Sequence, residues 1–447
     1  MIMCTSPAVI DVFQCIEYIQ KRRNEHGNDQ EDGRGKRRSQ AADCGLRERY
    51  YKILQGRDGR MTSSERIGKL RRMVIAQGLP KDAEFLGDPK CSRGQHEAGG
   101  EAKGGGGAKA NADAEADGAR DSDPPEDSCS LRGLVWKVLL GTFHVDAALY
   151  MRLVGRGPSA EDVKIKEDTF RTFQGNAEFR RRVHEDKLSR INNAFVRLNS
   201  PGGGVVAGES DAAGAGENDA ACNGNNREGR GGSSVASSKA GTAASAASGT
   251  VAGAGGGGGA GGKGLYVQGM MVLCAPLLFV MPEVDAFYSF NSLLNDHMPR
   301  YVAANLDGVH AGCALVDRAL NAVDPSLFNY LESKFVTANI YAFPLLMSLH
   351  ACVPPLEETL KLWDAMFSFG VHLEVLICVA QCVSLRETLL QDPNPYQHVN
   401  FRNLPPLDAE LLVAMAFSLI PHLPPDLMDE IAKHPFLDEQ KPVEGRE

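Results

Sequence analysis

Apolar residues recur at helical spacing in the last third of the chain. One set follows Pro355 and lies on a single helix face: Leu356, Leu360, Trp363 and Phe367. A second set follows Pro406: Leu411, Leu412, Met415 and Leu419. No stretch shows sustained alternation of apolar and polar residues, which is the pattern of a half-buried strand. The sequence therefore predicts an all-α fold with several helices.

Residues that start and stop helices support this prediction. Proline stands at four expected helix starts: Pro325, Pro355, Pro406 and Pro425. Farther upstream, the apolar pattern predicts a helix over residues 131–140, with Ser130 as its N-terminal cap and Gly141 as its end. Another helix is expected to begin near Ser159.

Two low-complexity segments interrupt the helical pattern. Residues 201–264 hold 21 of the 48 glycines and no aromatic residue, so they cannot bury enough apolar surface to offset the entropy of ordering. Residues 87–130 also lack aromatic residues and are rich in Gly, Ala, Asp and Glu. We predict that both are disordered insertions in one helical domain.

The predicted organisation has seven parts. They are a disordered basic arm (1–45), an N-terminal helical part (46–86), a low-complexity linker (87–130), a helical subdomain (131–200), a disordered insertion (201–264), the remaining helices (265–436) and a tail (437–447).

The net charge of −9 argues against a nucleic-acid partner, because neutralising phosphates requires a basic face. The exception is the N-terminal arm, where basic residues gather at 21–23 and 36–38. Their spacing is that of a bipartite nuclear-import signal, and a solvated disordered tail is the alternative interpretation.

The cysteines and the most apolar segment bear on the compartment. Eleven cysteines without a Cys-x-x-Cys pair or a signal peptide argue against a disulfide framework or a zinc site and favour a reducing cytosol. Cys378 and Cys382 are interpreted as buried thiols. Residues 265–281 are short for a bilayer span and contain Gln268 and Pro276, so we predict a core helix and no integral membrane segment.

The common catalytic motifs are incomplete or missing. Residues 257–263 match the phosphate-binding pattern GxxxxGK, but Gly264 stands where that motif needs a hydroxyl for magnesium. No His-x-x-x-His pair, Gly-x-Ser-x-Gly elbow or cluster of Asp, Glu and His occurs in the sequence, and His350 is interpreted as a packed core residue. We therefore expect no metal site, no bound cofactor and no nucleotide hydrolysis by the chain alone.

Four motifs follow one another along the helical segments. They are Arg132-x-x-x-Trp136, Ile165-x-x-Asp168-x-x-Arg171-Thr172, Tyr266-x-Gln268-Gly269-Met270 and Leu362-Trp363-Asp364-x-x-Phe367-x-x-Gly370. Together they resemble the TBC domain, the helical domain of Rab-type GTPase-activating proteins. The segment from Ser333 to Pro344 further resembles the branch of mitotic-exit and septation regulators known from fungi.

The resemblance implies a GTPase-activating protein for a Rab-like or Ras-like small GTPase. TBC domains are thought to lend the GTPase an arginine that neutralises charge and a glutamine that positions the attacking water, and the matching residues here are Arg171 and Gln268. GTP and Mg²⁺ would belong to the GTPase. The septation branch further implies a scaffold partner and work in the cytoplasm at a spindle pole or centrosome.

Seven residues are expected to support these two fingers. Asp168 is expected to orient Arg171 from one helical turn away, while Ile165 anchors that face in the core. The others are Tyr266 and Gly269, which would fix the backbone around the glutamine, and Thr172, Arg132 and Trp136.

Two departures from the TBC pattern leave a rival function open. Met271 stands where the family usually has asparagine, and the insertion 201–264 falls between the two fingers. The rival is a TBC module that binds a small GTPase or a scaffold without accelerating hydrolysis.

Overall fold

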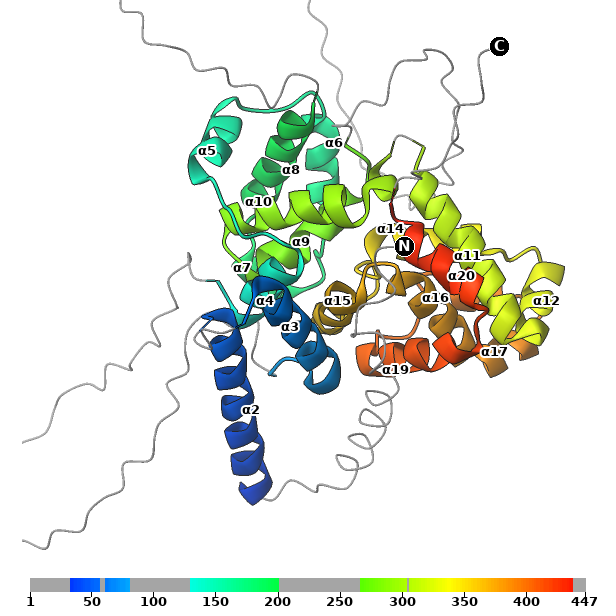
Figure 1. Cartoon of the computed structure of the whole chain (residues 1–447). Helices are drawn as coiled ribbons and strands as arrows, with labels where there is room; N and C mark the ends of the chain where they lie inside the picture. The colour runs from blue at the N-terminus through cyan, green and yellow to red at the C-terminus, as the bar shows by residue number, and fades with distance from the viewer. Residues whose placement is uncertain (1–32, 57–60, 81–128, 201–265, 304, 437–447) are drawn as a thin grey trace, which may run out of the picture.

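The structure is a computed structural model that describes residues 33–56, 61–80, 129–200, 266–303 and 305–436. Every regular element in these ranges is a helix, as Figure 1 shows, so the predicted all-α fold is confirmed there. The predicted insertion 201–264 and tail 437–447 lie outside the described residues, as does the linker 87–130 except for its last two residues.

The described helices up to residue 302 are α2 (Gly33–Leu54), α3 (Ser63–Gln77), α4 (Leu131–Leu139), α5 (Ala147–Gly155), α6 (Asp162–Thr169), α7 (Ala177–Arg182), α8 (Glu185–Asn199), α9 (Met270–Val280), α10 (Glu283–Ser292), η2 (Leu293–His297) and η3 (Pro299–Val302). Those that follow are α11 (Asp307–Val323), α12 (Pro325–Ser333), α13 (Ala338–Tyr341), α14 (Phe343–Ser348), α15 (Leu356–Phe369), α16 (Leu373–Ser384), α17 (Arg386–Gln391), α18 (Tyr396–Val399), α19 (Ala409–Leu419), η4 (Ile420–His422) and α20 (Pro425–Lys433).

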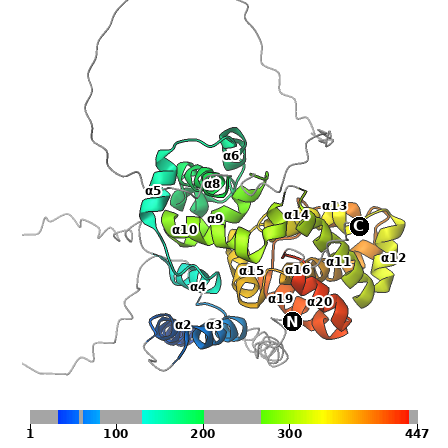
Figure 2. The same cartoon turned by 45° about the horizontal axis from the view of Figure 1, so that its top comes forward.

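The helices form two groups that meet at α15. Figures 1 and 2 show α4 to α10 on one side and α11 to α20 on the other, with α15 between them in both views. Helix α15 packs against α3, α4 and α9 as well as α16 and α19. Its predicted apolar face is confirmed, because Leu356, Leu360, Trp363 and Phe367 are all buried.

A buried carboxylate in α15 joins the two groups of helices. Asp364 accepts hydrogen bonds from Arg132 Nε at 3.1 Å and from Trp136 Nε1 at 2.7 Å, both in α4. A second contact from Arg132 Nη2 to the other carboxylate oxygen, at 3.2 Å, makes the ion pair bidentate. The Trp136 ring also packs edge-on against Phe367, with centroids 5.1 Å apart. Two motifs that are 228 residues apart in sequence are therefore one structural unit.

The predicted disordered arm, 1–45, is wrong over residues 33–45, which form the first part of α2. This stretch contains Lys, Arg, Gln and Ala, which are good helix formers, so its polar composition is compatible with a helix. Residues 1–32 lie outside the described part of the chain.

Most predicted helix boundaries are confirmed within a few residues. Ser130 caps α4 by accepting a bond from the Gly133 amide at 3.0 Å, and Gly141 follows the helix with φ at +74°. The predicted start at Pro406 is wrong, because α19 begins at Ala409. Its N-terminal cap is Asp408, whose side chain accepts a hydrogen bond from the Leu411 amide at 2.9 Å. Proline has no side-chain acceptor for this bond.

Helix α9 is the core helix predicted for residues 265–281. Ten of its eleven residues are buried, including Pro276. No helix in the described ranges is long and apolar enough to cross a membrane.

The cysteines agree with the prediction at all described positions except one. Six are free thiols, and Cys378 and Cys382 are buried as predicted. Cys44 is disulfide-bonded, a pairing that the argument against a disulfide framework did not anticipate.

Substituting Asp364 tests whether the two groups of helices depend on its carboxylate. We expect Asp364→Ala to lower the free energy of unfolding by about 3–5 kcal/mol, because Arg132 would keep a buried charge without its partner. Urea unfolding monitored by circular dichroism measures the change. The control is Asp429→Ala, which breaks an exposed pair with Lys433 and should cost far less. Equal losses in the two variants would contradict the assigned role of Asp364.

Candidate functional site

A second buried aspartate connects the two segments that carry the predicted fingers. Asp168 lies in the last turn of α6 and is 7% exposed. Its Oδ2 accepts a hydrogen bond from Tyr266 Oη at 2.9 Å and another from the Gly269 amide at 2.8 Å. Arg171 follows Asp168 by three residues, and Gln268 lies between the two donors. One carboxylate therefore holds both finger segments.

Local sequence explains why the carboxylate reaches these donors. Ile165 is fully buried one turn earlier, as predicted, and fixes the inward face of α6. Gly269 has φ at +99°, a conformation that L-residues avoid, and this places its amide toward α6 just before α9 begins. Burial, together with the Asp168 charge, raises the pKa of the Tyr266 phenol far above its usual value, so the hydroxyl remains a donor.

Asp168 does not orient Arg171 as the sequence predicted. The Arg171 Nε instead donates to the Glu167 carbonyl at 3.0 Å, and its Nη2 lies 3.8 Å from the Glu167 carboxylate. The helical spacing fails because α6 ends at Thr169, before the arginine. Thr172 closes this end by donating from Oγ1 to the Asp168 carbonyl at 2.8 Å.

Both predicted finger side chains are exposed. Arg171 has 59% of its side chain exposed and helps line an open hollow of about 540 Å³, together with Lys166, Glu167 and Phe170. Gln268 is exposed, and its amide makes no hydrogen bond to any residue that the structure describes. The Phe170 ring, 73% exposed, stands beside the arginine. These groups are open to a partner surface.

Met271 is buried beneath the glutamine loop. Its sulfur accepts a weak hydrogen bond from Asn192 Nδ2 at 3.2 Å and lies 3.9 Å from Thr169 Oγ1. The other amide atom, Asn192 Oδ1, is buried without a hydrogen-bond partner in the described structure. The departure from the TBC pattern therefore lies in the buried packing under the loop.

Arg132 and Trp136, two of the predicted supporting residues, belong to the core. Both are bound to Asp364 in α15 and are almost fully buried, at 4% and 0% exposure. They stabilise the domain that carries the fingers and offer no group to a partner.

A buried polar cluster was missed by the sequence analysis. His350 Nδ1 is hydrogen-bonded to Glu374, and Cys378 Sγ donates to the same carboxylate oxygen at 3.6 Å. Burial raises the pKa of Glu374, and the adjacent histidine opposes that rise. Glu374 and Cys378 are one helical turn apart, so the sequence could have indicated their proximity. His350 lies 24 residues from Glu374, and its contact could not be predicted from helical spacing.

Histidine, glutamate and cysteine are residue types that bind zinc. Their three ligand atoms lie within 4.8 Å of one another. Two ligands of one tetrahedral zinc ion would stand about 3.3 Å apart, whereas the imidazole and carboxylate here are in direct hydrogen-bond contact. We interpret the cluster as a buried polar pair of the core.

Comparison with known proteins supports the motif analysis. Residues 263–390 match the family model described as the Rab-GTPase-TBC domain. The chain is 34% identical over 306 residues to cell division control protein 16 of Schizosaccharomyces pombe, covering 68% of this chain and 81% of that protein. It is 30% identical to the mitotic check point protein BUB2 of Saccharomyces cerevisiae, covering 68% and 83%.

One solved structure that the chain is similar to is the Chlamydomonas flagellar RabGAP TBC domain. It has a TM-score of 0.44 and 15% sequence identity, with coverage of 65% of this chain and 80% of that chain. The matches to the two yeast proteins run across most of their length. This chain belongs to the TBC domain family, in the group that contains these two cell-division proteins.

Proposed function

We propose that the chain is a GTPase-activating protein for a Rab-like or Ras-like small GTPase and acts in mitotic exit or septation. Family membership supports the general activity. The observation that carries the two-finger mechanism is the Asp168 carboxylate, which holds the Arg171 and Gln268 segments together while both side chains face solvent.

The chemistry assigns a separate task to each finger. Phosphoryl transfer spreads negative charge over the transferring group, and a guanidinium contacts two of its oxygens at once. Arg171 supplies that group. The Gln268 amide both donates and accepts hydrogen bonds, so it can hold the attacking water in line with the phosphate. GTP and Mg²⁺ come with the GTPase, and the chain contributes no cofactor.

Arg171 is available for this task because its ion pair with Glu167 is weak. Its contact with Glu167 is long and both side chains are more than half exposed, at 59% and 64%. Exposed pairs of this kind contribute about 0–1 kcal/mol. A nucleotide phosphate, which carries more charge than a carboxylate, would displace Glu167 at little cost.

Met271 favours a second candidate function, a TBC module that binds a GTPase or scaffold without accelerating hydrolysis. The unpartnered Asn192 Oδ1 beside its sulfur marks imperfect polar packing under the Gln268 loop. A loop that shifts by about 1 Å would misplace the water and reduce the rate about 10²-fold. We further propose a scaffold partner and action in the cytoplasm at a spindle pole or centrosome, by analogy with the family branch.

Single-turnover GTP hydrolysis by a panel of small GTPases tests the proposed activity. We expect wild type to accelerate one of them, Arg171→Ala to lose about 10³- to 10⁵-fold, and Gln268→Ala to lose about 10²-fold. Arg171→Lys should remain deficient because an ammonium cannot make the bidentate contact. Thermal melting of each variant shows whether the domain is still folded.

The matched control is Arg181→Ala. Its side chain is 60% exposed and pairs with a nearby glutamate, much as Arg171 does, but it lies in α7. This variant should keep the wild-type rate. If wild type accelerates no GTPase yet binds one, the interaction module is the better function. If Arg171→Ala and Arg181→Ala are equally fast on an accelerated GTPase, the arginine assignment is wrong.

Asp168→Ala tests whether one carboxylate positions both fingers. Its loss leaves the Tyr266 hydroxyl and the Gly269 amide without their acceptor, so we expect a destabilisation of about 1–3 kcal/mol and faster hydrogen exchange at Gly269. Hydrolysis of the GTPase-bound GTP should slow even where the domain is folded.

Tyr266→Phe is the graded comparison for Asp168→Ala. It removes one of the two donors and keeps the Gly269 bond, so exchange at Gly269 should stay close to that of wild type. Equal exchange at Gly269 in wild type and Asp168→Ala would refute the positioning role.

A further inference from the structure

The turn between α12 and α13 exposes a phenylalanine on a well-defined backbone. Phe335 is 84% exposed, and Ile340 in α13 is 48% exposed. Two backbone bonds close the turn, from the Phe335 amide to the Glu332 carbonyl and from the Val336 amide to the Leu331 carbonyl, each 2.9 Å long. Phe335 has φ at +59°, so the turn holds the ring outward in a conformation that most side chains avoid.

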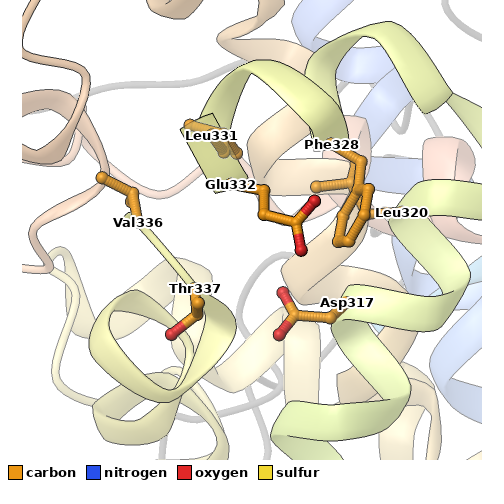
Figure 3. A pocket seen from close by; sticks show the side chains of 7 residues that line it. All are labelled: Asp317, Leu320, Phe328, Leu331, Glu332, Val336 and Thr337. Carbon is orange, nitrogen blue, oxygen red and sulfur yellow. The ribbon is translucent and has the colours of Figure 1, made fainter. Parts of the chain in front are cut away.

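A small pocket adjoins this turn, and Val336, the residue after Phe335, forms part of its wall. Its volume is about 50 Å³, which accommodates roughly three or four water-sized groups. Four apolar side chains form its walls: Leu320, Phe328, Leu331 and Val336. Figure 3 shows the carboxylates of Asp317, from α11, and Glu332, from α12, pointing toward one another across it. The pocket therefore combines an apolar lining with two acidic groups.

No basic side chain in the described structure forms an ion pair with either carboxylate. Asp317 accepts one bond, from the Ala338 amide at 3.0 Å, and its pKa is raised by burial and further by the Glu332 charge. The adjacent Lys334 places its ammonium 5.5 Å from the centroid of the Tyr330 ring.

The arginines of the neighbouring helices are also engaged elsewhere. Arg318 pairs with Glu430, and Arg386 pairs with Asp324 at 2.6 Å. The negative charge in the pocket is therefore not compensated by the described residues around it.

From this geometry we propose that the pocket and Phe335 form a docking surface for a partner protein that inserts a lysine between Asp317 and Glu332 and packs an apolar side chain on Phe335. A lysine fits because its ammonium is compact and donates three hydrogen bonds, while its methylene stem suits the apolar walls. A guanidinium is a wide plane and needs more room. Ile340 extends the apolar contact along α13.

This surface is separate from the finger site. Helices α12 and α13 lie in the group formed by α11 to α20, whereas α6 lies in the other group, and Figures 1 and 2 show α12 and α6 apart in both views. A partner on α12 therefore leaves Arg171 and Gln268 free for a GTPase. The docking surface extends the function to a second protein and does not depend on the chain being an active GTPase activator.

The test is a titration of the full chain with two peptides, followed by the amide resonances of Thr337 and Ala338. The first probe is acetyl-Leu-Lys-Leu-amide, and the second is the same peptide with norleucine, which keeps the stem and lacks the ammonium. We expect saturable shifts with the lysine peptide only. Asp317→Asn and Glu332→Gln should each weaken binding about fivefold, as expected for losing one charge contact.

Phe335→Ser separates the apolar contact from the charge contact. It should weaken the tripeptide but leave the binding of acetyl-lysine-methylamide unchanged, and Phe436→Ser, at a residue 42% exposed elsewhere, is the control. Equal shifts with the norleucine peptide, or unchanged binding in Glu332→Gln, would overturn the proposal. Sedimentation velocity tests whether a second copy of this chain occupies the surface. A dimer that Phe335→Ser turns into monomers would make a second copy of this chain the partner instead.

Discussion

The arrangement of this domain depends on the ion pair between Arg132 and Asp364. A guanidinium and a carboxylate that are both nearly buried stabilise a fold only when their geometry is good and the remaining polar atoms are satisfied. Here the pair is bidentate, and the Trp136 indole supplies a third donor. The pair fixes α4 against α15, and α15 in turn carries the apolar face on which both groups of helices pack. The two segments proposed to carry the fingers lie in the group of helices that contains α4.

Asp168 repeats the same principle closer to the surface. It is a buried carboxylate whose partners come from a segment about a hundred residues away, a hydroxyl and a backbone amide rather than a charge. Tyr266 is the first described residue after the predicted insertion 201–264, so the carboxylate fixes the chain close to the end of that segment. Loop-closure entropy rises only with the logarithm of loop length, which makes a long segment at this position tolerable.

The sequence predicted buried helix faces and motif segments better than it predicted the hydrogen-bond pairs between them. Helical periodicity identified the buried face of α15, and the motifs included the two segments that the Asp168 carboxylate joins. Pairings such as Asp168 with Gly269 were not predictable, because they depend on where α6 ends and on the positive φ of one glycine. For the same reason the Glu374 contact with His350 was missed: the sequence shows helical neighbours but does not show which turn packs against them.

Two arginines show how environment decides what a shared residue type can do. Arg132 is held by two carboxylate contacts in the core, so its guanidinium cannot leave without stranding a buried charge. The guanidinium of Arg171 has the same donor groups, but its contacts are with a backbone carbonyl and an exposed glutamate. Binding a phosphate needs a cation that is positioned but weakly committed. Of the two, Arg171 meets that requirement, and the Asp168 carboxylate joins its segment to the segment of Gln268.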